Sequence, residues 1–195
     1  MDEPIGIHGI ITIHKIPDEW TDEDFKRWWC PVVAPNGQVL QPARISDAIK
    51  REWQVPLLDG RMQAENLITN NGISQLLTNI GVQAQASMQP FTQILSVGNG
   101  NITGVTRGDT AVAGDGFGTN ARKAPASHAN FGFAVLVETS YASGDAVGTW
   151  SNIGFYGGGS ATTTTGTGTL ETHALFSFSK GAFAYAVDYL FLLSN

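Results

Sequence analysis

The stretch LETHALFSFSKGAFAYAVDYLFLLS, residues 170–194, decides the fold class. Side chains at every second position share one face of a β-strand, and both halves of this stretch follow that period. The first half places on one face Leu170, Thr172, Ala174, Phe176 and Phe178. The second half places on one face Phe183, Tyr185, Val187, Tyr189 and Phe191. We therefore predict two half-buried strands.

Three segments upstream are further strand candidates: FTQILSVG (91–98), FGFAVLVET (131–139) and WSNIGFYG (150–157). Turns rich in Gly and Thr separate them. This regular alternation of short strands and turns predicts a mainly β fold, in the form of a β-sandwich or a jelly-roll-like domain. Two long loops are expected at 98–130 and 157–169, and loops of such length are usually functional or covered by a partner.

A short amphipathic helix is predicted at 71–80, where the β domain opens. Its apolar stripe, at spacings i, i+3, i+4 and i+7, consists of Ile73, Leu76, Leu77 and Ile80. Asn70 is expected to cap the N-terminus, and Gly81 to close the helix in the left-handed conformation. So short a helix is not stable alone. We expect its stripe to cover the β domain of residues 66–195.

Residues 1–65 differ in composition from the rest. They hold 18 of the 28 charged residues and four of the five Trp, whereas 19 of the 23 Gly follow them. The run IGIHGIITIH is a strand candidate. Short helices are predicted at 21–29 and over DAIKREW, and we interpret the acidic run 18–24 as a solvated helix start rather than a metal site. Prolines separate these pieces, which predicts an arm of small elements.

Aromatic residues dominate the energetics of buried interfaces, so the arm is the predicted attachment region. The candidate contact residues are Trp20, Phe25, Trp28, Trp29 and Trp53. Packing of these side chains on the protein's own sheet is the alternative, and the sequence does not separate the two.

Charged residues make up only 14% of the chain, below the roughly 25% that is usual in soluble proteins. A surface so poor in charge favours a subunit of an assembly, such as a homotrimer with contacts in the loops at 98–120 and 157–169. A secreted β domain with a neutral surface is the alternative. The net charge of −6 argues against nucleic acid as the main partner.

The single cysteine, Cys30, excludes an intrachain disulfide and fits a reducing cytosol. The first residues lack the basic region of a secretory signal, and no apolar run reaches the roughly 18 residues of a membrane span. We expect synthesis in the cytoplasm and no membrane partner.

No hydrolase elbow, phosphate loop or zinc-helix motif occurs, and we predict no enzyme, no cofactor and no metal. The histidines are scattered, and structural roles are expected for His8, His14, His128 and His173. Asp109 and Asp115 lie in a Gly-rich loop but lack the spacing of a calcium motif. Arg107-Gly108-Asp109 matches an adhesion tripeptide that arises too often by chance to carry weight.

Two minor hypotheses involve carbohydrate. A sugar-binding sandwich would stack its ligand on Trp150, Phe155 and Tyr156. A polysaccharide hydrolase would need a carboxylate pair, for which Glu138 and Glu171 on predicted strands are the candidates.

The order of motifs from Glu65 to Asn195 resembles a group of small structural proteins of tailed bacteriophages. The resemblance rests on NLITNNG opening a helix, then FTQILSVGNG, a GDTAV loop leading to Arg107 or Arg122, and WSNIGFYGGG followed by TGTLETHALFSFSK. It implies a virion component in capsid decoration, a head fibre, or a tail fibre and baseplate. Residues 1–65, with FKRWWC, match no part of this pattern.

The hypothesis is thus a non-enzymatic structural component of a tailed-phage virion, assembled in the bacterial cytoplasm and bound to other phage structural proteins. Because the chain is short and lacks the repeats of a fibre shaft, a capsid-attached decoration or cement protein is favoured. A tail fibre or baseplate subunit, with host-glycan binding in one version, is the alternative.

Overall fold

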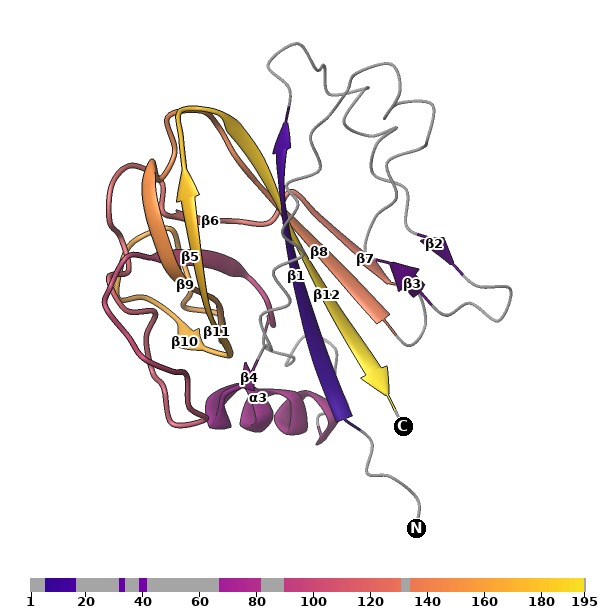
Figure 1. Ribbon diagram of the computed structural model, residues 1–195. Coiled ribbons are helices and arrows are strands. Elements are labelled where there is room, and N and C mark those ends of the chain that lie inside the picture. The colour runs from indigo at the N-terminus through magenta and orange to yellow at the C-terminus, as the bar shows by residue number, and fades with distance from the viewer. Residues whose placement is uncertain are drawn as a thin grey trace. The chain divides into compact units, whose positions relative to one another are not determined.

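The structure of the protein, a computed structural model, describes residues 6–16, 32–33, 39–41, 67–81, 90–130 and 134–194 (Figure 1). The chain divides into two compact units. Unit 1 consists of Met1–Gln63, Ala126–Ser143 and Ala182–Asn195, and unit 2 of Ala64–Pro125 and Gly144–Gly181. Unit 1 therefore joins the predicted arm to two segments of the predicted β domain.

Unit 1 contains an antiparallel sheet of four strands in the order β1-β12-β8-β7. These strands are β1 (Gly6–Ile16), β7 (Ser127–Asn130), β8 (Ala134–Tyr141) and β12 (Ala184–Ser194). The strand predicted near the start of the chain is confirmed, and it pairs with β12 from Gly6↔Ser194 to Ile16↔Ala184. A separate pair in this unit consists of β2 (Val32–Val33) and β3 (Val39–Gln41).

The last predicted strand is confirmed as β12, but its burial does not alternate as predicted, and Phe183 of the expected inner face is exposed and precedes the strand. The buried side chains of its expected inner face are Tyr185, Val187, Tyr189 and Phe191. Ala186 and Asp188, on the opposite face, are buried as well. The strand β12 is therefore covered on both faces, and an acidic side chain is enclosed on one of them.

Unit 2 contains an antiparallel sheet with the path β4-β11-β9-β5-β6, and β10 pairs with β9. Its strands are β4 (Leu67–Ile68), β5 (Ile94–Gly98), β6 (Arg122–Lys123), β9 (Gly148–Gly157), β10 (Thr169–Leu170) and β11 (Thr172–Lys180). Two larger antiparallel sheets and one helix among the described residues confirm the mainly β prediction and are consistent with a β-sandwich.

The prediction of one uninterrupted loop at 98–130 is wrong, because β6 and β7 lie within it. Both strands are short and carry polar side chains, so no apolar period marks them. The long loops of unit 2 are 99–121 and 158–168.

The helix α3 (Asn70–Gly81) is confirmed, but its cap is not Asn70. The hydroxyl of Thr69 accepts the amide of Gly72 at 3.1 Å and donates to the carbonyl of Leu170 at 2.6 Å. The amide of Thr69 also donates to the carbonyl of Glu171 at 2.9 Å. The sheet thus holds Thr69 at the start of the helix, where its hydroxyl reaches the first turn. At the other end, Gly81 lacks the positive φ that was expected.

Only half of the predicted apolar stripe is covered. Leu77 is 63% exposed and Ile80 is 80% exposed, whereas Ile73 and Leu76 are half-buried. The helix meets the sheet at Gly72, where a Cβ atom would collide with the carbonyl of Glu171. Contact at the first turn therefore leaves the far end of the stripe uncovered. No helix among the described residues is long and apolar enough to cross a membrane.

Candidate functional site

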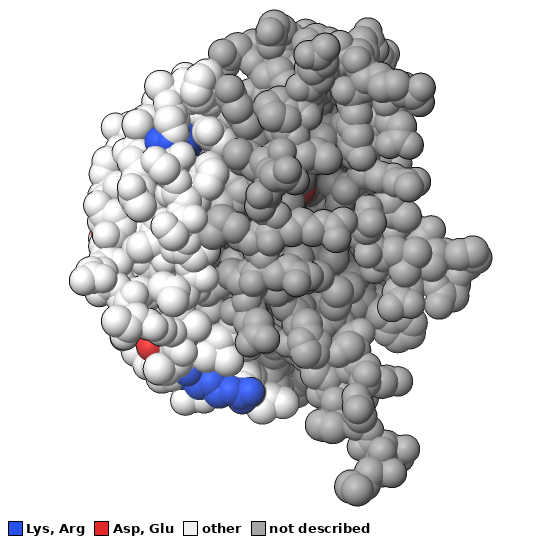
Figure 2. Space-filling model, in the orientation of Figure 1, with Lys and Arg blue, Asp and Glu red and all other residues white. Residues whose placement is uncertain are grey.

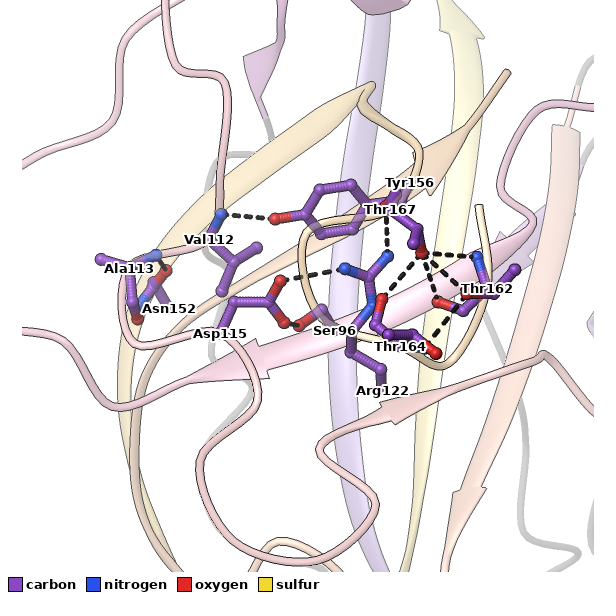
Figure 3. A network of polar contacts seen from close by, with 10 residues as sticks. All are labelled: Ser96, Val112, Ala113, Asp115, Arg122, Asn152, Tyr156, Thr162, Thr164 and Thr167. Atoms are coloured by element: carbon purple, nitrogen blue, oxygen red, sulfur yellow. Dashed lines mark hydrogen bonds and ion pairs between the residues drawn. The ribbon is translucent and has the colours of Figure 1, made fainter. Parts of the chain in front are cut away.

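The two long loops of unit 2 are held on the sheet by a buried arginine. Arg122 is on β6, and its Nη1 atom lies 3.0 Å from Oδ2 of Asp115 in the first loop. Its Nη2 atom donates to the carbonyl of Thr167 in the second loop at 2.7 Å (Figure 3). The guanidinium also lies over the ring of Tyr156, 4.2 Å from the centroid. One side chain therefore ties both loops to β6 and β9.

The first loop makes further bonds to the sheet around this arginine. The hydroxyl of Ser96 donates to Oδ1 of Asp115 at 2.5 Å, so both carboxylate oxygens of Asp115 are engaged. The amide of Val112 donates to the hydroxyl of Tyr156 at 2.8 Å. Burial raises the pKa of Tyr156 to about 12. The phenol is therefore neutral at physiological pH and accepts this bond with its oxygen.

The second loop is braced by its own hydroxyl groups. The Thr167 hydroxyl lies 2.7 Å from the carbonyl of Thr164, and it accepts the amide of Thr162 at 3.0 Å. The hydroxyls of Thr162 and Thr167 are 2.8 Å apart. Residues Thr162 to Gly166 are nonetheless exposed. The low-complexity loop thus presents a surface of threonine held by internal bonds.

Each ring nitrogen of His173, on β11, lies within hydrogen-bond distance of a side-chain oxygen. The Asn152 amide is oriented by Ala113, whose amide donates to Oδ1 at 2.8 Å and whose carbonyl accepts from Nδ2 at 2.9 Å. Nε2 of His173 lies 3.0 Å from that Oδ1. Nδ1 lies 2.6 Å from Oδ2 of Asp109. The ring thus connects the first loop to β9 and β11.

Asp109 is ionised in this arrangement. Burial raises its pKa, but hydrogen bonds from Thr106 and His173 outweigh burial and bring the pKa below its ordinary value. Its two oxygens accept the amide and the hydroxyl of Thr106 at 2.9 and 2.6 Å. The acidic member of the Arg107-Gly108-Asp109 tripeptide is thus committed to internal contacts, and a receptor would have to break them.

Arg107, the basic member of the same tripeptide, has a fixed backbone and an exposed side chain. Its backbone carbonyl accepts the amide of Asn70 at 2.8 Å, which fixes the turn against the start of α3. Its side chain is exposed. The resemblance left open whether Arg107 or Arg122 is the arginine associated with the GDTAV loop. Arg122 is buried and Arg107 is exposed.

The remaining cations of unit 2 gather at one carboxylate. Nζ of Lys123 lies 2.6 Å from Oδ2 of Asp145, and Nδ2 of Asn120 donates to Oδ1 at 2.7 Å. Lys180 is buried nearby, and its burial lowers the pKa of its ammonium group, whereas Asp145 acts in the opposite direction.

The described part of unit 2 consequently exposes few charged side chains. Its described part contains four carboxylates and four Lys or Arg side chains, at 107, 109, 115, 122, 123, 145, 171 and 180. Among these eight, Arg107 is the exposed one, and the others are buried or half-buried. Figure 2 shows the described atoms as predominantly white. The charged side chains mainly hold loops to the sheet.

The residues predicted to stack on sugars lie in the core. Trp150 and Phe155 are 0% exposed and Tyr156 is 3% exposed. Trp150 packs edge-on against Phe178 with ring centroids 5.4 Å apart, and its Nε1 donates to the carbonyl of Ala146 at 2.7 Å. Buried rings offer no free face to a ligand, so this hypothesis loses the residues on which it was built. The predicted attachment residues Trp20, Phe25, Trp28, Trp29 and Trp53 lie outside the described residues.

The two glutamates considered for a hydrolase belong to different units. Glu138 lies opposite Asp188 across β8 and β12, and burial together with that carboxylate raises its pKa to about 7. Glu171 is fully buried in unit 2, and burial raises its pKa to about 8 despite the amide of Thr92, which donates to Oε2 at 2.8 Å. Each carboxyl therefore has its own enclosed environment.

The carboxylates of Asp109 and Asp115, which were compared above with calcium motifs, are also engaged within the protein. Both carboxylates are taken up by protein donors, one by Thr106 and His173 and the other by Ser96 and Arg122. Within the part of the chain that the structure describes, no group of three or more His, Cys, Asp or Glu residues could hold a metal ion.

Stability should fall with rising pH because of Glu171, and Glu171→Gln should remove that effect. The folded pKa of about 8 lies above the ordinary carboxyl pKa of 4.5, so the folded state retains a proton that the unfolded state releases. Between these values the wild type should lose about 1.4 kcal/mol per pH unit relative to the variant. Urea unfolding at pH 5, 6, 7 and 8 measures this difference. Parallel stability curves would mean that Glu171 is ionised in the fold.

Sequence reasoning missed the two side-chain contacts that organise the loops, His173 with Asp109 and Arg122 with Asp115. His173 and Asp109 are 64 residues apart, and no local spacing connects them. Arg122 and Asp115 are close in sequence, but nothing in the sequence marks Arg122 as buried. The GDTAV motif was the one signal that pointed to this loop.

No protein-family model, no curated protein and no solved structure was found to match this chain.

Proposed function

We propose that this protein is a non-enzymatic structural subunit of a tailed-phage virion, and that the loop surface of unit 2 contacts neighbouring subunits. The observation that carries the proposal is the nearly uncharged surface of unit 2, on which Arg107 is the one exposed charged residue among the eight described. The resemblance of residues 65–195 to small phage structural proteins points in the same direction.

The physical argument for assembly is that the described surface of unit 2 exposes few charges and that its loops are braced. Interface cores are depleted of charged residues, and an uncharged surface is poorly protected against association. The loops 99–121 and 158–168 are braced by Arg122 and by threonine hydroxyls. A braced loop loses little conformational freedom on contact, so less of the contact energy is lost to ordering. Such loops suit repeated contacts in a lattice.

Within this class we favour a capsid-attached decoration or cement protein over a tail fibre or baseplate subunit. The sequence of residues 1–195 has no repeats from which a fibre shaft could be built. The Trp-rich residues 1–65 supply aromatic anchors for the capsid surface.

The copy number in purified particles tests the proposal. Virions of the phage that encodes the chain are separated into heads and tails, and each fraction is quantified by mass spectrometry against the major capsid protein. We expect hundreds of copies in the head fraction. A few to a few dozen copies in the tail fraction would instead support the fibre or baseplate alternative. Absence from both fractions would overturn the virion proposal.

A further inference from the structure

His173 joins the first long loop of unit 2, residues 99–121, to the sheet. Its side chain is 3% exposed, and its Nδ1 atom lies 2.6 Å from Oδ2 of Asp109 in that loop. Its Nε2 atom lies 3.0 Å from Oδ1 of Asn152 on β9. A buried titratable ring therefore connects the loop to two strands, β9 and β11.

The hydrogen-bond partners of the ring determine how many protons the arrangement needs. The Asn152 amide has one orientation, because Ala113 donates its own amide to Oδ1 and accepts Nδ2 at its carbonyl. Oδ1 is thus an acceptor, and a hydrogen bond to it needs a proton on Nε2 of His173. A hydrogen bond between Nδ1 and Oδ2 of Asp109 then needs a second proton, whichever of the two atoms carries it.

The surroundings of Asp109 favour the ring nitrogen as the carrier of that second proton. The two oxygens of Asp109 accept the amide and the hydroxyl of Thr106 at 2.9 and 2.6 Å. Burial raises the pKa of Asp109, but the bonds from Thr106 and the contact with His173 together bring it below its ordinary value. An ionised carboxylate therefore faces Nδ1.

The described neighbours of the ring come from β4, β9 and the first loop. The strand β4 pairs Leu67 with His173, and β9 places Asn152 at Nε2. The first loop places Asp109 at Nδ1. Among the described charged residues, Asp109 is therefore the one in contact with the ring.

Two other charged groups of unit 2 lie close to this contact in the sequence. Arg107 belongs to the same turn as Asp109, and its side chain is exposed. Glu171 precedes His173 by two positions, and burial raises its pKa to about 8. Residues 64–125 and 144–181, which form unit 2, contain no histidine besides His173. Glu171 is therefore the second group whose titration a test must remove.

We propose that the contact between Asp109 and His173, here named the latch, is a pH-sensitive switch that holds the first loop on the sheet while Nδ1 carries a proton. When that proton is lost, a nitrogen lone pair faces a carboxylate oxygen, and neither atom can donate. The closed latch holds a proton that the open latch releases, so rising pH favours opening. Histidine suits this role because its charge changes between about pH 5 and 8.

Opening of the latch should free the turn of residues 106–109. The carbonyl of Arg107 in this turn accepts the amide of Asn70 at 2.8 Å, so the start of α3 should loosen with it. The carboxylate of Asp109 would then be available to solvent. The inference goes beyond the proposed function, because it concerns the single subunit and does not depend on a virion.

Nitrogen-15 NMR of the His173 ring in the full-length chain tests the protonation step. We expect both ring nitrogens to be protonated at about pH 5, and Nδ1 alone to have lost its proton by about pH 9. A ring that keeps one protonation state across this range would overturn the inference, and so would loss of the proton from Nε2 instead.

Amide hydrogen exchange at Thr106 and Asn70 tests the opening step. All chains carry Glu171→Gln, which removes the other titrating group. His173→Asn offers Asp109 an amide donor that does not titrate, so the latch should stay closed at every pH. His173→Phe keeps a planar ring without nitrogen, so the latch should be open at every pH. Circular dichroism checks that each chain is folded.

The chain that retains His173 should match His173→Asn at about pH 5 and exchange at least about tenfold faster than it at about pH 9. Comparison at equal pH removes the intrinsic pH dependence of exchange. The amide of Val97, which donates to the carbonyl of Ala121 at 3.1 Å, is the control and should exchange equally in all chains. Equal exchange at Thr106 with and without His173→Asn at about pH 9 would refute the latch. Equal acceleration at Val97 would also refute it, because the whole fold would then be opening.

Discussion

Replacement of Arg122 by methionine is expected to lower the free energy of unfolding by about 3–5 kcal/mol. The substitution leaves the enclosed carboxylate of Asp115 without its cation and removes the donor to the carbonyl of Thr167. Methionine fills most of the same space with a flexible chain, so a cavity adds little to the effect. Urea unfolding at neutral pH, followed by tryptophan fluorescence, measures the loss.

Lys123→Met is the matched control on the same strand. This side chain pairs with Asp145 at 2.6 Å but is 28% exposed, whereas the Arg122 side chain is 1% exposed. Partly exposed ion pairs contribute at most about 1 kcal/mol, and Asp145 keeps the donor Asn120 and the nearby Lys180 when Lys123 is replaced, so the control should lose less stability than Arg122→Met. Equal losses in both variants would contradict the view that Arg122 holds the two loops on the sheet.

The second large effect is expected at Trp150. Trp150→Ala should destabilise the protein by about 3–5 kcal/mol, because a large ring is removed from a close-packed core. The ring has no solvent exposure, and it contacts Phe176 and Phe178 at centroid distances of 6.5 and 5.4 Å. Thermal or urea unfolding monitored by circular dichroism measures the change.

Trp150→Phe separates packing from hydrogen bonding. It keeps an aromatic ring and loses the donor to the carbonyl of Ala146, so it should cost about 1–3 kcal/mol. The carbohydrate hypothesis predicts the reverse pattern, in which the alanine variant stays stable and a glycan array reports lost binding. That outcome would return Trp150 to the list of ligand-contacting residues.

Local patterns predicted several elements correctly because their signals lie within a few residues. The alternation around Tyr185 and Tyr189 identified β12, and the spacing of Leu76 and Ile80 identified α3. The cap was misassigned to Asn70 because both Thr69 and Asn70 are good capping residues. The bonds of Thr69 to Gly72, Leu170 and Glu171 decide between them.

The candidate site was much less predictable. Trp150 and Tyr156 have the residue types of a sugar platform, yet they are core residues, since burial depends on what packs over a strand. Short strands such as β6, with Arg122 and Lys123, carry no period that a sequence could reveal. The exposure of Leu77 and Ile80 follows from the contact at Gly72, which the helical pattern does not contain.

By itself the sequence determined the mainly β class, the short helix at 71–80 and a composition poor in charge, since these follow from composition and from periods of two to four residues. Among the eight charged residues described in unit 2, only the tertiary structure decided which are enclosed and that Arg107 is exposed. His173 meets Asp109 across 64 positions, and Arg122 reaches Thr167 across 45. Such pairs form only when strands distant in sequence are brought together, because hydrogen bonds and buried ion pairs depend on separations of about 3 Å.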